Sequence, residues 1–427
     1  METNRRIPVA GAALTAAVLL TLSQGCQLTD IGWAPVGRAA AAPLAPDPPQ
    51  IPADERASLQ ERLDEVVTEG SSGVVAELVV TGPGGSDVWT GTSGTADRAT
   101  GAPIDQGAHF RIASISKPFL ATVLLELVGE GRVELDGTVE EYLPGLLNRG
   151  DEVTLRMLLS HTSGIYSFSR SMPPVLGTPD RQWRPEELVA IANEHEFVFE
   201  PGQGGGYSNT NYVLVAMVIE KVTGVPYDQE VSRRLLEPLG LDQTFIPSTV
   251  DMPAPVLHAY LPVRAFPGAE PEPAEITEFN PTRWYGTAQI VSTVADVNHF
   301  YTELLGGKVL DPPELAQMLT VQGLSPQQGY GYGLGPHQRR LSCGVQVWMH
   351  SGHIPGYRTW TVHSEDRHFT MFQARFDADP DAPAWSVIET ALCPPETGGP
   401  RPEVPSAPPS EAPSAPPGEA GRGSSAG

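Results

Sequence analysis

Ser114 and Lys117 are the first residues in this chain whose types and spacing could carry out chemistry. Positions i and i+3 share one face of a helix, so the serine hydroxyl and the lysine amine can meet there. A serine hydroxyl is a poor nucleophile without an adjacent base, and a lysine can be that base when burial lowers its pKa. An apolar helix pattern follows at 119–128, and N–H groups at a helix start can stabilise an oxyanion. An ordinary serine at a helix N-cap is the alternative interpretation.

Tyr207-Ser208-Asn209 is a second candidate set, which follows a glycine run and precedes an apolar helix pattern at 212–222. This position predicts that Tyr207 is held at a junction between a loop and a helix. A cationic Lys117 nearby would favour the phenolate, which could accept the serine proton and return it to the leaving group. Asn209 offers an amide donor for a substrate carbonyl. A turn closed by an aromatic side chain is the alternative.

His350-Ser351-Gly352-His353 is a third set, at the end of a strand predicted at 345–349. The small Gly352 lets a substrate backbone approach the strand. His350 could supply a positive charge or a proton donor, and Ser351 could hold a substrate carboxylate. The backbone N–H of His353 could be one oxyanion donor, and that of the nucleophile the other.

Metal binding is the rival interpretation of the third set, since four histidines lie close together in sequence: His350, His353, His363 and His368. Strand alternation would separate their side chains, and no Asp or Glu stands at a spacing that suits zinc. We therefore predict no metal and no other cofactor.

The three sets together resemble the serine β-lactamase and penicillin-binding family, in its order S-x-x-K, Y-x-N and K/H-[ST]-G. Class A β-lactamases carry S-D-N at the second place, whereas Tyr207 resembles class C β-lactamases and one group of D-alanyl-D-alanine carboxypeptidases. Leu341-Ser342-Cys343-Gly344 is similar to the secreted carboxypeptidases of Gram-positive bacteria. The resemblance covers roughly residues 55–394, and three further segments agree with it: LLSHTSGI at 158–165, YSNTNY at 207–212 and YGYGLG at 330–335.

The resemblance implies a role for each set. Ser114 would be acylated, Lys117 and Tyr207 would handle protons, and water would then release the acyl group. The substrate would be held at three points: its amide by Asn209, its terminal carboxylate by His350 and Ser351, and its oxyanion by the N–H groups of Ser114 and His353.

Two departures bear on the substrate. His350 replaces the lysine usual in β-lactamases, which favours the carboxypeptidase subgroup, and Ser351 replaces the more usual threonine while keeping a hydroxyl. The carboxylate of a D-alanine leaving group would favour a further cation. Arg339 or Arg340 could supply it, and His337 stands in the same stretch.

We therefore predict a serine D-alanyl-D-alanine carboxypeptidase that acts on peptidoglycan stem peptides and is acylated by penicillins. Its partners would be small peptides that end in D-Ala-D-Ala, or β-lactams. A class C-like β-lactamase and an esterase of the same fold are alternatives. An inactive surface binding module is an alternative of another kind, against which the intact Ser114, Lys117 and Tyr207 argue.

Composition agrees with an exported enzyme, which we expect to be a monomer. Of 427 residues, 27 are basic and 51 acidic, and the net charge of −24 would repel nucleic acid. Residues 1–41 resemble a signal peptide, with a basic start and an apolar run at 7–22, although a buried N-terminal helix is the alternative. The residues before Cys26 resemble a lipoprotein box, so the secreted protein could be anchored to the cell envelope through Cys26.

The rest of the chain predicts one α/β (α+β) domain at 55–394, between a linker at 42–54 and a disordered Pro/Ser/Ala/Gly-rich tail at 395–427. Strand patterns lie near both ends and helix patterns in the middle, which predicts an antiparallel sheet flanked by helices plus a mostly helical lobe. Cys343 and Cys393 remain once Cys26 is removed or lipidated. An exported protein favours pairing them, as in the carboxypeptidase subgroup, and two free thiols are the alternative.

Overall fold

The computed structural model describes residues 46–265, 269–322, 330–375 and 381–393. The predicted signal peptide, Cys26 and the predicted tail lie outside these residues. Residues 46–52 have no regular secondary structure, and helix α1 (Ala53–Thr68) begins inside the predicted linker. Among the described helices, none combines the length and the apolar character that crossing a membrane requires.

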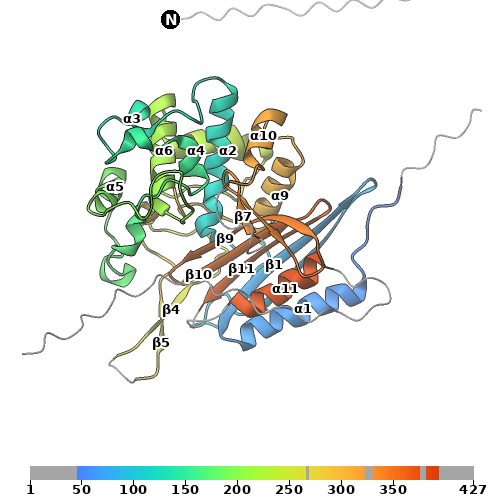
Figure 1. Ribbon diagram of the computed structural model, residues 1–427. Helices are drawn as coiled ribbons and strands as arrows, with labels where there is room; N and C mark the ends of the chain where they lie inside the picture. Colours follow the sequence, from blue (N-terminus) through green and yellow to red (C-terminus); the bar gives the residue numbers. More distant parts are fainter. Residues whose placement is uncertain (1–45, 266–268, 323–329, 376–380, 394–427) are drawn as a thin grey trace, which may run out of the picture. The chain divides into compact units, whose positions relative to one another are not determined.

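A seven-stranded antiparallel sheet is the centre of the fold, and it joins the two ends of the chain (Figure 1). Strand β1 lies beside the last strand, β11, with Val75 opposite Phe372. A two-residue turn at Pro83-Gly84 connects β1 to β2, as Gly82 pairs with Gly85. The strands in spatial order are β2 (Gly85–Gly94), β1 (Ser71–Gly82), β11 (Arg367–Arg375), β10 (Tyr357–His363), β9 (Gln346–Ile354), β8 (His337–Arg340) and β7 (Tyr330–Tyr332).

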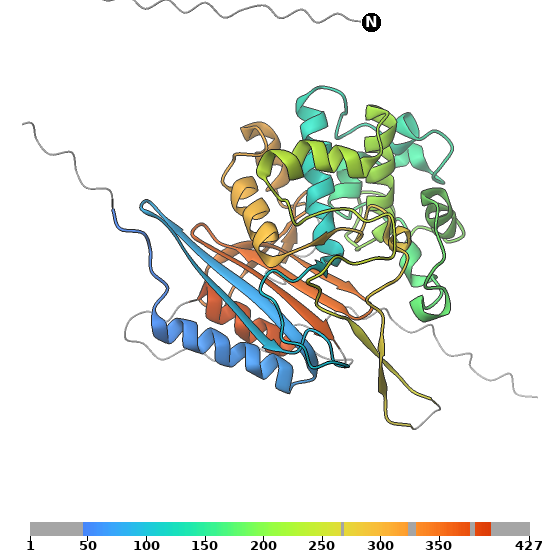
Figure 2. The ribbon, with the colours of Figure 1, turned by 180° about the vertical axis from the view of Figure 1, so that it is seen from behind.

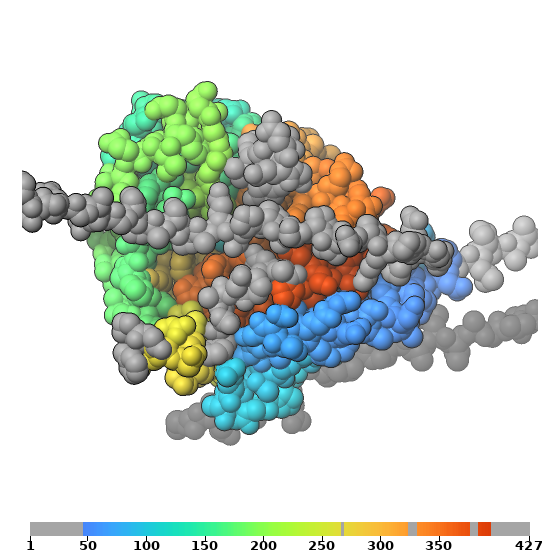
Figure 3. Space-filling view, turned by 60° about the horizontal axis from the view of Figure 1, so that its bottom comes forward, coloured from blue at the N-terminus to red at the C-terminus, as the bar shows by residue number. Residues whose placement is uncertain are grey.

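Helices α1 and α11 (Asp381–Leu392) cover one face of the sheet, and the helical lobe covers the other (Figures 1 and 2). Alternate residues of a strand point to opposite faces, so the sheet contributes to two separate cores. Leu78 packs with Leu59 of α1 in one core, while Val75 belongs to the other. Figure 3 shows the surface of α1, in blue, along the orange and red C-terminal part of the chain.

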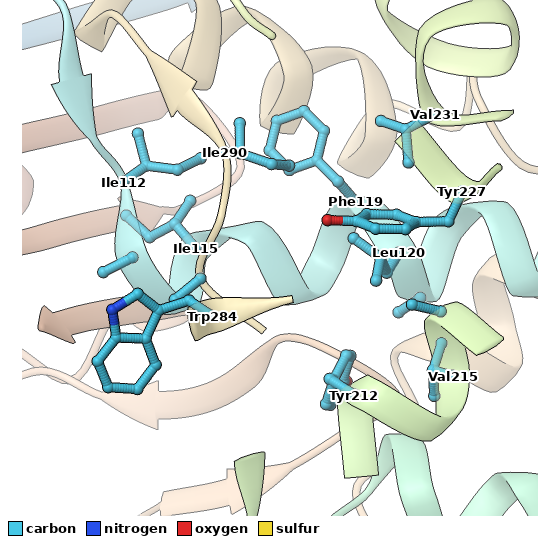
Figure 4. Packing of buried hydrophobic residues seen from close by; sticks show 14 of the residues in the cluster. Ile112, Ile115, Phe119, Leu120, Tyr212, Val215, Tyr227, Val231, Trp284 and Ile290 are labelled. Atoms are coloured by element: carbon cyan, nitrogen blue, oxygen red, sulfur yellow. The ribbon is translucent and has the colours of Figure 1, made fainter. Parts of the chain in front are cut away.

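Helix α2 (Ser116–Gly129) runs through the middle of the lobe. Its residues from Ser116 to Leu125 are all buried, and most of them are apolar, as expected of a helix in a protein core. Figure 4 shows Phe119 and Leu120 of α2 among Tyr212, Tyr227 and neighbouring apolar side chains. The other helices are α3 (Val139–Tyr142), α4 (Leu155–Leu159), α5 (Pro185–Asn193), α6 (Asn209–Thr223), α7 (Tyr227–Val231), α8 (Glu237–Leu239), α9 (Val294–Leu305) and α10 (Pro312–Met318).

Two short antiparallel pairs complete the lobe. One pair joins β3 (Phe110–Arg111) to β6 (Val291–Ser292), and the other joins β4 (Tyr260–Val263) to β5 (Glu272–Glu275). The first pair bears on the candidate site, because β3 ends three residues before Ser114. The predicted fold class, an antiparallel sheet flanked by helices with a mostly helical lobe, is confirmed.

Cys343 and Cys393 form a disulfide with their Cα atoms 5.9 Å apart. The bond connects the turn between β8 and β9 to the end of α11. Glu389 lies close to both sulfur atoms, but each sulfur is bonded to the other and is therefore not available as a metal ligand.

Candidate active site

Ser114 lies in a 3₁₀ turn, Ala113–Ile115, between β3 and α2. Ala113 has a φ of 52°, in the left-handed region that a residue with a Cβ seldom adopts. Such strain persists only where the surroundings impose it, and it is common beside functional groups. Only 8% of Ser114 is exposed to solvent, and Lys117 on the first turn of α2 is fully buried.

The Lys117 amine lies 2.9 Å from Ser114 Oγ, 2.9 Å from Asn209 Oδ1 and 3.0 Å from the carbonyl oxygen of Thr287. Burial lowers the pKa of this amine well below its ordinary value. A neutral amine fits all three contacts, because it can donate to the two oxygens that only accept and can take a proton from the serine hydroxyl. The geometry therefore suits Lys117 as a base toward Ser114.

Tyr207 lies at the predicted junction, two residues before α6, and its ring centroid is 4.9 Å from the Lys117 amine. A phenolate at Tyr207 would be favoured by a fixed positive charge at Lys117. The lowered pKa of Lys117 weakens that cause. A tyrosine that keeps its proton can still donate it to a leaving group.

Asn209 occupies the predicted place, but its amide contacts other protein groups. Oδ1 accepts from Lys117, and Nδ2 donates to Ser169 Oγ at 3.0 Å. The backbone N–H of Asn209 donates to Ser167 Oγ, also at 3.0 Å. Ser169 uses one N–H of the Asn209 amide, and the second N–H of the same NH2 group is the one that could donate to a substrate carbonyl. No residue pattern pointed to Ser167, Ser169 or Thr287, since they act through tertiary contacts and Thr287 through its backbone.

The predicted strand at 345–349 continues to Ile354 as β9, so the third set lies inside a strand and not after it. A Cβ at Gly352 would lie 2.2 Å from Thr359 Oγ1 and 2.5 Å from the carbonyl oxygen of Ile112. The absent side chain of Gly352 therefore lets the protein's own backbone before Ser114 approach the strand. The sequence predicts that a substrate backbone approaches at this position. Thr359 Oγ1 also donates to Ile112 O at 2.9 Å, which holds this segment against the sheet.

His350 is buried, with Nδ1 2.7 Å from the carbonyl oxygen of Ser351 and Nε2 2.8 Å from the hydroxyl of Tyr332. A carbonyl only accepts, so Nδ1 carries the proton and Nε2 accepts from Tyr332. Burial, together with the neighbouring His337 and Lys117, lowers the pKa of His350 well below its ordinary value. The lowered pKa does not support a positive charge at His350, because burial penalises the charged form, and the other predicted role, a proton donor, stays a prediction.

The other residues proposed to bind a carboxylate do not bring a cation to Ser114. The Arg339 guanidinium stacks 3.9 Å from the Trp385 ring of α11, and Arg339 pairs with Val347, whose side chain belongs to the α1/α11 core. Arg340 is exposed and donates to the carbonyl oxygen of Gly344 at 3.1 Å. Burial lowers the pKa of His337 to about 3. The prediction that one of these three residues provides the cation is not supported.

Strand β9 has an edge beside this segment. Strand β8 pairs with residues 346–349 only, and among the described residues 350–354 pair with β10 alone. Ser351 is half-buried in register with Trp360, which places its side chain on the opposite face from His350, and His353 is exposed. An extended substrate could add to such an edge through main-chain hydrogen bonds.

Comparison with known proteins agrees with this geometry. Residues 59–385 match the beta-lactamase family model. The chain belongs to the beta-lactamase family. This family of serine hydrolases includes amidases, peptidases and esterases.

A D-stereospecific amidohydrolase from Streptomyces sp. is 36% identical, with a TM-score of 0.72, and the match covers 80% of this chain and 99% of that one. The D-amino acid amidase from Ochrobactrum anthropi SV3, solved with L-phenylalanine amide, is 28% identical with a TM-score of 0.70, over 79% and 98% of the two chains. Penicillin-binding protein 4* of Bacillus subtilis (strain 168) is 27% identical over 69% of this chain and 66% of its own length. Matches to the next two curated relatives span 58% and 51% of those proteins.

Proposed function

We propose that this protein is a D-stereospecific amidohydrolase that forms an acyl-enzyme on Ser114. The observation that carries the proposal is the buried Lys117 amine, 2.9 Å from Ser114 Oγ and without a carboxylate among its three hydrogen-bond partners. A lysine with a lowered pKa can accept a proton at neutral pH, which an ordinary surface lysine cannot.

The reaction would proceed in two halves. Lys117 takes the hydroxyl proton while Ser114 Oγ attacks the substrate carbonyl, and the oxyanion is held by the N–H groups of Ser114 and His353. Tyr207 gives its proton to the departing amine nitrogen as the C–N bond breaks, and recovers one from Lys117. A water molecule then attacks the acyl-enzyme and passes its proton to the same pair of residues. The acid is released and Ser114 is restored.

The leaving group is inferred from the charges around the site. A D-alanine leaving group would carry a carboxylate, yet His350 and His337 are neutral and Arg339 stacks on Trp385 across the sheet. A neutral leaving group, as in an amide, needs no such cation. Two solved relatives bear amidase or amidohydrolase names that specify D-amino acids or D-stereospecificity, and these support the D-configuration.

The D-alanyl-D-alanine carboxypeptidase predicted from the sequence remains the second candidate. The course of β9 beyond the end of β8 favours it, because an extended stem peptide could lie along that strand.

Parallel assays with three substrates test both candidates. We expect ammonia release from D-phenylalanine amide, little or none from L-phenylalanine amide, and slower D-alanine release from a diacyl-D-Ala-D-Ala peptide. Ser114→Ala should abolish turnover. Ser116→Ala is the matched control, since Ser116 is buried in the same segment and its hydroxyl accepts from the N–H of Ile290. Faster D-alanine release than ammonia release would favour the carboxypeptidase, and full activity of Ser114→Ala would refute the mechanism.

Export is a further part of this proposal and rests on the signal-like residues 1–41. Mass spectrometry of the mature protein from a bacterial host that expresses the full chain tests it. Cleavage near residue 41 supports secretion, a diacylglycerol on Cys26 supports anchoring, and an uncleaved chain contradicts both.

A further inference from the structure

His161 is a fully buried histidine in contact with the Tyr207 ring, and no step of the proposed mechanism uses it. The two ring centroids are 4.2 Å apart, with an interplanar angle of 31°. His161 has a φ of 56°, in the left-handed region, so the fold maintains it at a conformational cost. The segment around it, residues 158–165, agrees with the family resemblance in sequence, and no role follows for His161 from the sequence alone.

The backbone and side chain of His161 bind the residues on both sides of Tyr207. The carbonyl oxygen of His161 accepts from the N–H of Gly206 at 2.9 Å. Its ring atom Nδ1 lies 3.2 Å from the N–H of Ser208 and 3.2 Å from Nδ2 of Asn211. Since the Ser208 N–H can only donate, Nδ1 is the acceptor and carries no proton. His161 thus binds the backbone on both sides of Tyr207, at Gly206 and Ser208, and its ring packs against the Tyr207 ring.

The groups that face the imidazole keep it neutral. Burial, then Lys117 and His337, lower the pKa of His161 well below its ordinary value. Tyr212 and Tyr332 border the ring at 5.5 and 4.8 Å between centroids. A protonated imidazole would turn Nδ1 into a donor, break its contact with Ser208 and place a positive charge near Lys117.

We propose that His161 is a positioning residue, which holds Tyr207 where it can protonate the leaving nitrogen. This inference rests on the proposed acyl-enzyme at Ser114. The positioning role predicts a difference between amide and ester substrates. The leaving nitrogen of an amide must be protonated, whereas the p-nitrophenolate that leaves an activated ester need not be. Loss of His161 should therefore slow amide hydrolysis much more than ester hydrolysis.

Two variants separate the two contacts of the side chain. His161→Asn keeps an acceptor for Ser208 and tolerates the left-handed backbone, but it lacks the ring face. His161→Phe keeps a ring face and loses the acceptor. His363→Phe is the control, since His363 is also fully buried and stacks on a tyrosine, with its centroid 4.4 Å from that of Tyr301.

The measurement is kcat/KM for D-phenylalanine amide and for the p-nitrophenyl ester of N-acetyl-D-phenylalanine, with thermal unfolding of each variant. We expect both His161 variants to lower the amide-to-ester ratio by about tenfold or more, since misplacing Tyr207 forfeits part of the roughly 100- to 10,000-fold that general acid–base catalysis contributes. The control should keep the wild-type ratio even if it unfolds at a lower temperature. An equal loss on both substrates, or an unchanged ratio in both His161 variants, would overturn the positioning role.

The wild-type protein and Ser114→Ala separate this result from a failure of the proposed function. If the wild type hydrolyses the ester but no amide, the amidohydrolase proposal fails. The His161 ratio is then measured with acylation by a penicillin in place of amide hydrolysis, because the β-lactam nitrogen must also be protonated. If Ser114→Ala keeps both activities, the nucleophile is wrong and the positioning role falls with it.

Discussion

Replacement of Gly352 by alanine is the perturbation whose effect the structure defines most sharply. The added Cβ would lie 2.2 Å from Thr359 Oγ1, 2.5 Å from Ile112 O and 2.8 Å from Ala113 Cβ. All three contacts are shorter than any relaxed Cβ contact, and one is with backbone, so the segment before Ser114 must move away from β9. Overpacking of this kind costs about 1–3 kcal/mol of the free energy of unfolding. A displacement of about 1 Å at the nucleophile can lower the rate about 100-fold.

Gly177→Ala is the matched control, because no atom lies within 4 Å of a Cβ at that position. Urea unfolding gives the free energy of each variant, and kcat/KM for D-phenylalanine amide gives the activity. We expect Gly352→Ala to lower both the free energy of unfolding and kcat/KM, and Gly177→Ala to keep both at the wild-type values. A Gly352→Ala protein with wild-type stability and wild-type kcat/KM would show that β9 and the 3₁₀ turn do not constrain each other.

Four further outcomes are expected. Lys117→Ala should lower kcat/KM by about 100-fold or more. In the wild type, kcat/KM should fall as the pH decreases through the lowered pKa of Lys117, because protonation removes the base; a pH profile that Lys117→Ala leaves intact would contradict this. The Cys343–Cys393 disulfide spans 50 residues, so the double serine variant should lose about 4 kcal/mol of the free energy of unfolding, and an unchanged melting temperature would refute that value. Arg339→Ala should leave kcat/KM for a diacyl-D-Ala-D-Ala peptide unchanged, whereas a large rise in KM would place Arg339 at the carboxylate after all.

Features that depend only on residues close together in the sequence were predictable. The i, i+3 spacing of Ser114 and Lys117 brings hydroxyl and amine to 2.9 Å, because a helical turn sets that geometry regardless of the rest of the fold. The turn between β1 and β2 and the end of α6 at Gly224, with a φ of 75°, likewise follow from local backbone preferences.

The charges of the site residues, and the face of the sheet to which each side chain points, were not predictable in this way. His350 reads as a cation in the sequence, but its pKa depends on burial beneath Tyr332 and beside His337, which only the packed sheet and lobe produce. Arg339 lies eleven residues before His350 in the sequence, yet strand alternation places its guanidinium against Trp385 on the other face.

The sequence by itself therefore determined the chemical groups of this protein and their order along the chain. Tertiary structure decided which of those groups carry charge and which partners they contact. The 3₁₀ turn approaches Gly352 across 238 residues of sequence, and His161 reaches the flanks of Tyr207 from a separate loop. The reason is physical: pKa values depend on solvent exclusion, and solvent is excluded only when distant segments pack together.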